Sequence, residues 1–169
     1  MNAELPGKTI SNFGRGNKTH KFLWLNRPDD EYEAILPGLT VTGASSFGRS
    51  IYLNLGDHML WWNDAGGKIL YHAPGENLPK NFHLVWNFVD GSALTYALKM
   101  WGGIKLLNSS EFGEVPNQES GVQPLSSVFT LERLNQMLDE YPDKGSKGIK
   151  GFLVATGHAI PNHIHGLGN

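Results

Sequence analysis

Short runs of apolar or alternating residues recur from about residue 8 to residue 107, and turn-forming residues separate them. Alternation with a period of two is typical of β-strands, because successive side chains of a strand point to opposite faces of its sheet. Asp90-Gly91 indicates a hairpin, since tight β-turns need residues that tolerate positive φ. Many antiparallel strands around one core predict a sandwich or a barrel. The predicted strands are KTISNF (8–13), HKFLWL (20–25), TVTGAS (40–45), SIYLNL (50–55), HMLWWN (58–63), KILYH (68–72), HLVWNF (83–88), ALTYAL (93–98) and GIKLL (103–107).

Three other segments carry helical patterns. In PDDEYEAIL (28–36) the acids come early, where the N-terminal end of the helix dipole favours negative charge. In FTLERLNQMLDEY (129–141) apolar residues recur at helical spacing, and Thr130 suits the N-cap position. A second short helix is predicted for IKGFLVAT (149–156). The apolar stripe of the 129–141 helix consists of Leu131, Leu134, Met137, Leu138 and Tyr141.

A polar stretch punctuated by Gly and Pro, NSSEFGEVPNQESGVQP, follows the last predicted strand and is typical of a linker or a long exposed loop. We therefore predict an α+β protein with a β-sandwich domain at 1–108, a linker at 109–123 and the first helices of an α-helical domain at 124–169. Two short helices bury little core, so we expect the natural polypeptide to continue beyond Asn169.

Composition narrows the protein class. Hydrophobic residues make up 40% of the chain and aromatic residues 11%, which favours a packed globular protein over a disordered one. The chain has no cysteine, which excludes disulfides and thiolate metal sites and fits a reducing cytoplasm. No signal peptide and no apolar run of the roughly 20 residues that cross a membrane is visible, so we expect a soluble, intracellular protein.

The charge is unevenly distributed although the formal net charge is only −2. No acid occurs from Gly7 to Pro28 or from Lys144 to Asn169. Such segments could steer an anionic polymer to one face, or they could be ordinary solvated surface. The first segment carries Lys8, Arg15, Lys18, Lys21 and Arg27, and the second carries Lys144, Lys147 and Lys150.

Three histidines near the end of the sequence, His158, His163 and His165, are candidate ligands for Zn²⁺ or Ni²⁺. No Asp, Glu or Cys lies between Lys144 and the end to complete a coordination shell. We therefore favour exposed histidines, or histidines in a phosphate-binding loop that add positive charge near about pH 6, and predict no metal site.

Four stretches, read in order, carry a resemblance to one family. They are ELP (4–6), HLVWNFVDGSALTYALKMWGG (83–103), PLSSVFTLERL (124–134), and IKGFL (149–153) followed by GLGN (166–169). Together they resemble the bacterial formamidopyrimidine-DNA glycosylase and endonuclease VIII family of base-excision repair enzymes. The resemblance implies a two-sheet β-sandwich followed by a helix-two-turn-helix domain. The family's C-terminal finger, which often holds zinc, would be absent from this chain, so we expect no cofactor here.

The resemblance also implies a mechanism. Family members flip a damaged base out of the duplex, attack the sugar C1′ with an N-terminal proline amine and cleave the strand through a Schiff base. Glu4 matches the acid that follows the proline and assists protonation and ring opening of the sugar. Ala3 occupies the place of the proline, behind Met1-Asn2, so its amine becomes free only when those two residues are removed. The family's long first helix is missing, because Pro6 leads directly into Gly7.

Candidate DNA contacts follow from the same resemblance. Arg49 occupies the slot of a phosphate-binding lysine on a hairpin, and arginine can bind phosphate bidentately. LKMWGG matches the segment that fills the gap left by the flipped base, while only Ala65 lies near the family's methionine slot. Lys150 and Asn169 match the lysine and asparagine that bind phosphates beside the lesion. The candidate DNA-binding residues are Arg49, Lys99, Met100, Trp101, Lys150 and Asn169, although Trp101 could equally be a packing residue and Arg49 an ordinary hairpin arginine.

The leading hypothesis is therefore a base-excision repair glycosylase, with possible abasic-site lyase activity, that acts on oxidised or ring-opened bases in damaged double-stranded DNA. One alternative is a catalytically silent relative that binds damaged or abasic DNA. Another is a β-sandwich module that binds a ligand other than nucleic acid. The resemblance implies a cytoplasmic, nucleoid-associated bacterial protein, without a membrane or protein partner that can be inferred.

Overall fold

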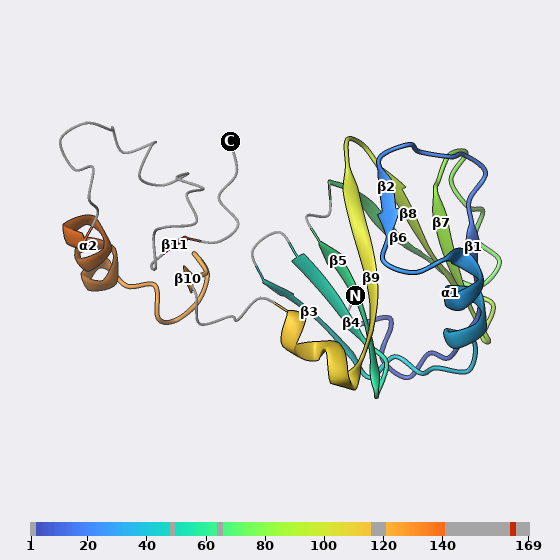
Figure 1. Cartoon of the computed structure of the whole chain (residues 1–169), viewed down its shortest axis with the longest axis horizontal. Coiled ribbons are helices and arrows are strands. Elements are labelled where there is room, and N and C mark those ends of the chain that lie inside the picture. The colour runs from blue at the N-terminus through green and yellow to red at the C-terminus, as the bar shows by residue number, and fades with distance from the viewer. Residues whose placement is uncertain (1–2, 48–49, 64–65, 116–120, 141–162, 165–169) are drawn as a thin grey trace. The chain divides into compact units, whose positions relative to one another are not determined.

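The computed structural model describes residues 3–47, 50–63, 66–115, 121–140 and 163–164 (Figure 1). Contacts along the backbone divide the chain into two compact units. The first comprises residues 1–46 and 50–113, and the second comprises residues 47–49 and 114–169.

The first unit is built on two β-sheets (Figure 1). The four-stranded sheet is antiparallel throughout, with the order β1-β7-β8-β6. Its strands are β1 (Ile10–Arg15), β7 (Leu84–Phe88), β8 (Ala93–Leu98) and β6 (Gly67–His72). The five-stranded sheet has the order β2-β9-β5-β4-β3, in which β2 joins β9 in parallel and β5 pairs antiparallel with β9 and β4. Its strands are β2 (Leu23–Leu25), β9 (Gly102–Asn108), β5 (His58–Asn63), β4 (Ser50–Asn54) and β3 (Gly43–Phe47).

The core lies between these sheets. Trp62 on β5 and Trp86 on β7 are fully buried, and their rings meet edge to face with centroids 5.3 Å apart. Side chains from both sheets belong to the same buried cluster, which also takes in Leu5 from the segment before β1. Burial of large apolar side chains supplies the main driving force for folding. The sandwich predicted from the alternating pattern is confirmed.

A single α-helix among the described residues of this unit, α1 (Asp29–Ile35), follows Pro28 and contacts β1. Asp29 in its first turn accepts two hydrogen bonds from Arg15 of β1, at 2.7 and 2.6 Å. The buried Tyr32 points inward, and its hydroxyl lies 2.9 Å from the carbonyl oxygen of Ile104 on β9. The helix predicted at 28–36 is confirmed, and it closes the sandwich beside the edge strand β1 (Figure 1).

A short 3₁₀ helix, η1 (Ser109–Glu114), lies in the stretch that the polar composition assigned to a linker. Asn108 accepts hydrogen bonds from the backbone N–H and the hydroxyl of Ser110, at 3.0 and 2.6 Å. Glu111 forms a bidentate ion pair with Arg27, at 2.9 and 2.7 Å. These contacts order the start of the segment, because its polar groups bind one another. The polar composition alone predicted that they would be solvated.

The second unit contains α2 (Leu131–Glu140) and two short strands, β10 (Gly121–Val122) and β11 (His163–Ile164), which pair in parallel. Met137 of α2 is buried with Val122, with Phe129 and Leu134 packed against them. Thr130 caps the helix as predicted, since its hydroxyl accepts the N–H of Arg133 at 3.2 Å. Leu131, the first residue of the predicted stripe, is exposed. The helix predicted at 149–156 lies outside the described residues.

Candidate nucleic-acid interface

The segment from Lys99 to Trp101 crosses from one sheet to the other at an end of the sandwich. It joins β8 of the four-stranded sheet to β9 of the five-stranded sheet, and we call it the crossover. Its backbone is held at both ends, because the N–H of Lys99 donates to the carbonyl of Gly66 at 2.9 Å and the N–H of Gly102 donates to that of Phe22 at 3.2 Å. These two hydrogen bonds fix the backbone of the crossover and therefore the positions from which its side chains extend.

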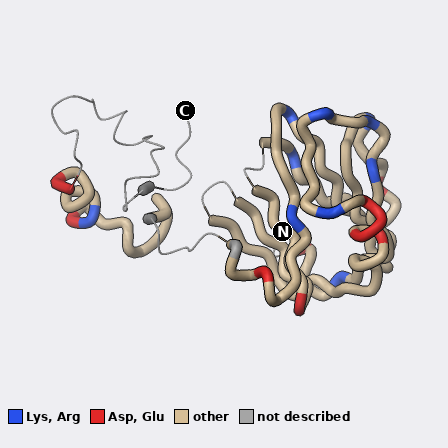
Figure 2. Tube along the Cα trace, viewed as in Figure 1, with Lys and Arg blue, Asp and Glu red and all other residues tan. Residues whose placement is uncertain are grey.

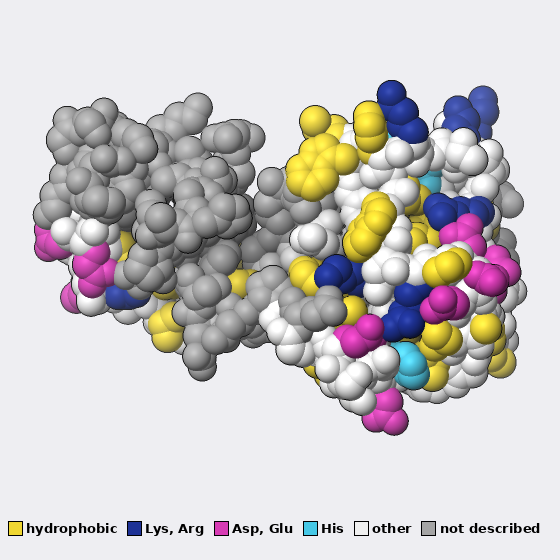
Figure 3. Space-filling view, viewed as in Figure 1, with side chains coloured by type: hydrophobic (Ala, Val, Ile, Leu, Met, Phe, Trp, Pro, Cys, Tyr) yellow, Lys and Arg dark blue, Asp and Glu magenta, His cyan; other side chains and the backbone are white. Residues whose placement is uncertain are grey.

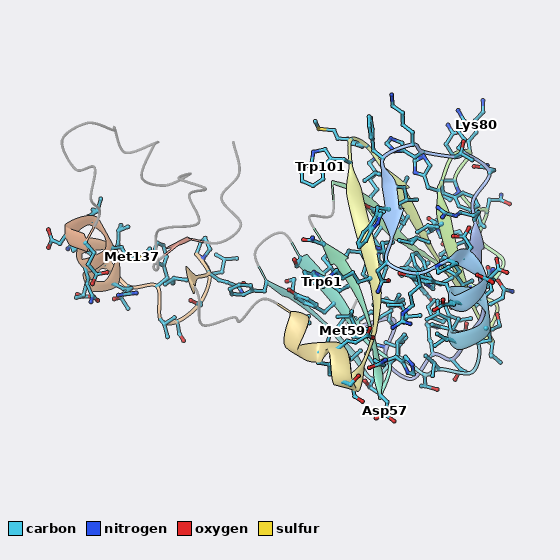
Figure 4. The ribbon with its side chains drawn as sticks, in the orientation of Figure 1. Asp57, Met59, Trp61, Lys80, Trp101 and Met137 are labelled. Atoms are coloured by element: carbon cyan, nitrogen blue, oxygen red, sulfur yellow. The ribbon has the colours of Figure 1, made fainter. Side chains whose placement is uncertain are left out.

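Large apolar side chains extend from the crossover into solvent. Met100 is 69% exposed and Trp101 is 57% exposed, and Lys99 beside them is exposed as well. Figure 4 labels Trp101 at the end of the sandwich, away from Asp57 at the opposite end. Contiguous exposed apolar surface of this kind marks interaction sites more often than ordinary surface does.

Two further aromatic side chains extend this surface. Phe22 and Trp24 are 55% and 52% exposed, whereas Leu23 and Leu25 pack against the core. The alternation follows from the extended backbone around β2, which turns residues 22 and 24 to one face and residues 23 and 25 to the other. In the space-filling view, hydrophobic side chains gather at this end of the sandwich, with Lys or Arg side chains beside them (Figure 3).

These side chains enclose a pocket of about 360 Å³, which we call the aromatic pocket. Its walls include the rings of Phe22, Trp24 and Trp101, with Lys21 and Asn63 as polar side chains. None of the described residues that line it is acidic. Its lining also includes the backbone of Gly102 and Gly103, where β9 begins.

Positive charge surrounds this end of the first unit. Lys and Arg positions gather there in the Cα trace, whereas Asp and Glu lie mainly at α1, at η1 and at the opposite end (Figure 2). Lys21 stands next to the pocket, with its ammonium nitrogen 4.6 Å from the centroid of the Phe22 ring. That distance is within the range of a cation–π contact. Cationic and aromatic groups at one place suit a polyanion that carries planar bases.

His83 binds the backbone directly before the crossover. Its Nδ1 accepts the backbone N–H of Leu98, the residue before the crossover, at 2.8 Å. Burial lowers the pKa of His83, and the nearby His20 and Lys18 lower it further because they disfavour a second positive charge. The neutral imidazole can accept this hydrogen bond, whereas an imidazolium cannot.

The candidate catalytic residues Ala3 and Glu4 are exposed in a turn that precedes β1. Leu5, which follows them, is fully buried in the core. The N–H of Gly7 donates to the carbonyl of Val41 at 2.8 Å, and the N–H of Lys8 donates to that of Leu5 at 3.0 Å. The turn is thus tied down directly behind Glu4, whose carboxylate faces solvent.

Arg49, Ala65, Lys150 and Asn169 lie outside the described residues, as do His158 and His165. Within the described ranges no three His, Cys, Asp or Glu residues form a group that could hold a metal ion. The structure thus joins Lys99, Met100 and Trp101 in one surface and places Ala3 and Glu4 in a turn of the same unit.

Phe22, Trp24, Asn63 and Gly103 were not among the residues predicted from the sequence. Two signals were available for them. The run FLWL is apolar at every position, so the outer face of that strand cannot be an ordinary polar face. The Gly-Gly pair after Trp101 sits at the start of a strand, where glycine often marks a close approach of another group.

No protein-family model matches the chain. The formamidopyrimidine-DNA glycosylase of Bacillus licheniformis is 28% identical to it over 150 residues, and that of Shouchella clausii is 30% identical over 150 residues. Each alignment covers 86% of this chain and 51% of the relative. The chain is homologous to the formamidopyrimidine-DNA glycosylases.

Solved structures agree with that relationship. The formamidopyrimidine-DNA glycosylase of Lactococcus lactis, bound non-covalently to DNA that contains an AP site, superposes with a TM-score of 0.71 at 19% identity, over 99% of this chain and 60% of that one. A complex of the Lactococcus lactis enzyme with DNA that contains FAPY-dG gives a TM-score of 0.71 at 20% identity, with the same coverage. These structures confirm the fold predicted from the resemblance. The chain spans about half the length of the curated relatives it matches.

Proposed function

We propose that this chain is the sandwich-containing part of a base-excision repair glycosylase that removes oxidised or ring-opened bases from duplex DNA. The observation that carries the proposal is the crossover, which presents Met100 and Trp101 to solvent from a backbone fixed at both ends. The homology with formamidopyrimidine-DNA glycosylases supports the same proposal. Its macromolecular partner is damaged double-stranded DNA.

Trp101 serves to keep the duplex open. A base that leaves the stack creates a gap, and an inserted aromatic ring recovers part of the lost stacking, which is worth about 1–3 kcal/mol per base. Met100 adds apolar contact at the same step, and Lys99 neutralises an adjoining phosphate. The fixed crossover favours insertion, because little conformational freedom remains to be lost on binding.

Glu4 supplies the acid of the proposed reaction. In an amine-dependent glycosylase the nitrogen bonds to C1′ while the bond between C1′ and the base breaks, and the base leaves with a proton. The acid then protonates the sugar ring oxygen as the ring opens, which yields an iminium ion. Ala3 offers a primary amine for this step only in a chain that begins at Ala3.

A catalytically silent DNA-binding relative is the second candidate function. Ala3 favours it, because a backbone amide nitrogen behind Met1-Asn2 is not a nucleophile. The binding surface at Trp101 serves this protein equally well. The two candidates differ only in whether the bound base is released.

Binding and release are measured separately to test the proposal. The 169-residue chain is titrated with duplexes that carry an abasic analogue, 8-oxoguanine or a formamidopyrimidine base, and with an intact duplex. We expect tighter binding to damaged duplexes, and about tenfold weaker binding after Trp101→Ala, since about 1.4 kcal/mol of lost stacking corresponds to that factor. Val89→Ala is the matched control, because Val89 is 71% exposed in the turn at the other end of β8. Equal, weak binding to intact and damaged duplexes would contradict both candidates.

Product analysis decides between the candidates. Glu4→Gln should abolish release of the damaged base while it leaves binding unchanged. Glu33→Gln, on the exposed face of α1, is the control carboxylate. Borohydride, which reduces an iminium ion to a stable amine, should trap a covalent complex only with a chain that begins at Ala3. Binding without any released base, from either form of the chain, would establish the silent relative.

A further inference from the structure

We propose that the aromatic pocket is a nucleobase-binding subsite, which stacks one unpaired base of the bound DNA against Trp24 while Lys21 neutralises the adjoining phosphate. The inference rests on the proposed function, because it requires that the chain bind damaged duplex. It adds a second site of contact with a base to the proposed insertion of Trp101 into the duplex. The occupant is a base without a pairing partner, such as the base opposite an abasic site.

The first argument is the position of the aromatic side chains on a sheet edge. β2 is one of the two edge strands of the five-stranded sheet, and Phe22 and Trp24 each expose more than half of their surface there. Natural sheet edges are usually protected by charged residues, proline or bulges, since exposed apolar edges promote aggregation. An edge that instead displays two aromatic rings beside Trp101 is better explained as a binding surface.

The second argument is that one side of the Trp24 indole packs beside the backbone of β9. A Cβ atom added to Gly103 would lie 2.7 Å from Cε3 of Trp24, which is closer than real Cβ contacts come. The indole therefore lies directly against the backbone of β9, where only glycine leaves room for it. The rest of the indole is exposed, so a planar ring can stack on it.

The third argument concerns the chemistry of the occupant. Planar aromatic walls match every nucleobase, since all bases have a π face. The side chain of Asn63 offers a carboxamide, which can donate to and accept from the edge of a base. The volume of about 360 Å³ lies at the lower end of the range of small-molecule sites, about 300–1,000 Å³.

Charge favours nucleic acid over an apolar peptide or a neutral ligand. Lys21 stands at the pocket without an acidic neighbour among the described lining residues. It belongs to the segment from Gly7 to Pro28, which contains five basic residues and no acid. Lys8, Arg15 and Arg27 of that segment are paired with acids, so a phosphate attached to a bound base would meet chiefly the positive charge of Lys21.

Two duplexes isolate the contribution of the base. The first carries an abasic analogue opposite 2-aminopurine, and the second carries abasic analogues at both opposed positions, so that no unpaired base remains there. Wild-type chain should bind the first duplex roughly tenfold more tightly than the second, by the measured size of base stacking on an aromatic ring. The 2-aminopurine emission should fall on binding, because stacking on an indole quenches it.

Variants assign that difference to the pocket. Trp24→Ala should weaken binding of the first duplex to the level of the second and leave the second unchanged. Trp24→Phe, which keeps a stacking surface, should retain most of the preference and shows that the fold survives substitution. Gly103→Ala should reduce the preference by displacing the indole. Trp101→Ala should weaken both duplexes, and Val89→Ala neither.

Other outcomes have distinct meanings. Equal wild-type binding of the two duplexes, or equal loss for both with Trp24→Ala, overturns the subsite while tight binding of abasic DNA upholds the proposed function. Failure of the wild-type chain to prefer either duplex over intact DNA overturns both. Displacement of 2-aminopurine by an apolar peptide, without competition by a nucleoside, assigns the pocket to a protein partner and overturns the subsite.

Discussion

The protonation state of His83 decides whether its ring can hold the backbone next to the crossover. Its Nδ1 accepts the N–H of Leu98, which directly precedes Lys99, and only the neutral ring can do this. The groups that face the imidazole, His20 and Lys18, disfavour its protonation, and burial lowers its pKa further. Protonation would therefore remove an acceptor and place a cation beside other cations.

The first prediction follows from the direction of that pKa shift. The pKa of His83 is lowered in the folded chain, whereas the unfolded value is about 6.5. The unfolded chain thus binds the proton more readily, and stability is lost as pH falls from about 6.5 through the folded pKa. Denaturant unfolding at about pH 7.5 and about pH 5.5 measures this loss, which should shrink in His83→Asn, whose side-chain oxygen takes the place of Nδ1 and can still accept the N–H. An identical pH dependence in the variant would show that His83 carries no part of it.

The resemblance to the glycosylase family pointed to part of the candidate site. LKMWGG matches the family segment that fills the gap left by the flipped base, which singled out Lys99, Met100 and Trp101, and the structure exposes all three. Their role as DNA contacts stays a prediction. Phe22 and Trp24 escaped notice because their exposure depends on the pairing of β2 with β9, which lies about 80 residues further along the chain. Local sequence does not determine which strands become neighbours.

Among the secondary-structure elements, the pairing of β6 with β8 holds the start of the crossover. Gly67 pairs with Leu98, and a Cβ atom at Gly67 would lie 2.4 Å from the carbonyl oxygen of Ala97 and 2.9 Å from Cα of Leu98. Both of these are backbone atoms, which cannot swing aside as a side chain can. Any side chain at residue 67 must therefore push the two strands apart, at the point where Gly66 accepts the N–H of Lys99.

The second prediction is that Gly67→Ala lowers the free energy of unfolding by about 1–3 kcal/mol, the usual cost of forcing extra atoms into a packed site. Binding of abasic duplex should weaken as well, because the crossover loses its alignment. Gly14→Ala is the matched control, since Gly14 also lies in a strand and a Cβ atom there meets nothing within 4 Å. Equal effects of the two substitutions on stability and binding would show that the close approach at Gly67 is unimportant.

Most elements of the sandwich could be predicted because alternation and turn residues are local signals. Their bounds were less certain where side chains make their own contacts. β2 begins at Leu23 instead of residue 20, because the N–H of Leu23 donates to the carbonyl of His20 and forms a turn there. The Asp90-Gly91 hairpin is real, with Gly91 at φ +83°, but its connection spans four residues and Asp90 accepts the N–H of Ser92. The 3₁₀ helix η1 escaped prediction because it depends on the distant Arg27.

For the molecule as a whole, the distribution of charge matters more than the net charge. Basic positions gather at the end of the sandwich that carries Trp101, although the chain as a whole is slightly acidic (Figure 2). Local positive potential attracts DNA and releases condensed counterions on binding. No helix within the described ranges is long and apolar enough to cross a membrane. The homology covers about half of each relative, so activity on a base remains a proposal for this chain.

The third prediction concerns salt. The logarithm of the affinity for abasic duplex should fall linearly with the logarithm of the salt concentration, with a slope set by the number of phosphates neutralised. Lys21→Ala and Lys99→Ala should each reduce that slope by about one, because each removes one phosphate contact. Lys8→Ala is the control, since Lys8 is already paired with Asp90 in the turn at the other end of β8. An unchanged slope in both test variants would place the DNA on another face.

The five tryptophans of the chain fall into two optical classes. Trp61, Trp62 and Trp86 are buried, whereas Trp24 and Trp101 are half exposed, and both of these line the aromatic pocket. A dissolved collisional quencher such as iodide reaches only the exposed pair, and the cationic Lys21 concentrates the anion beside it. The fraction of tryptophan fluorescence that iodide quenches therefore reports whether the aromatic pocket is occupied, and no added label is needed.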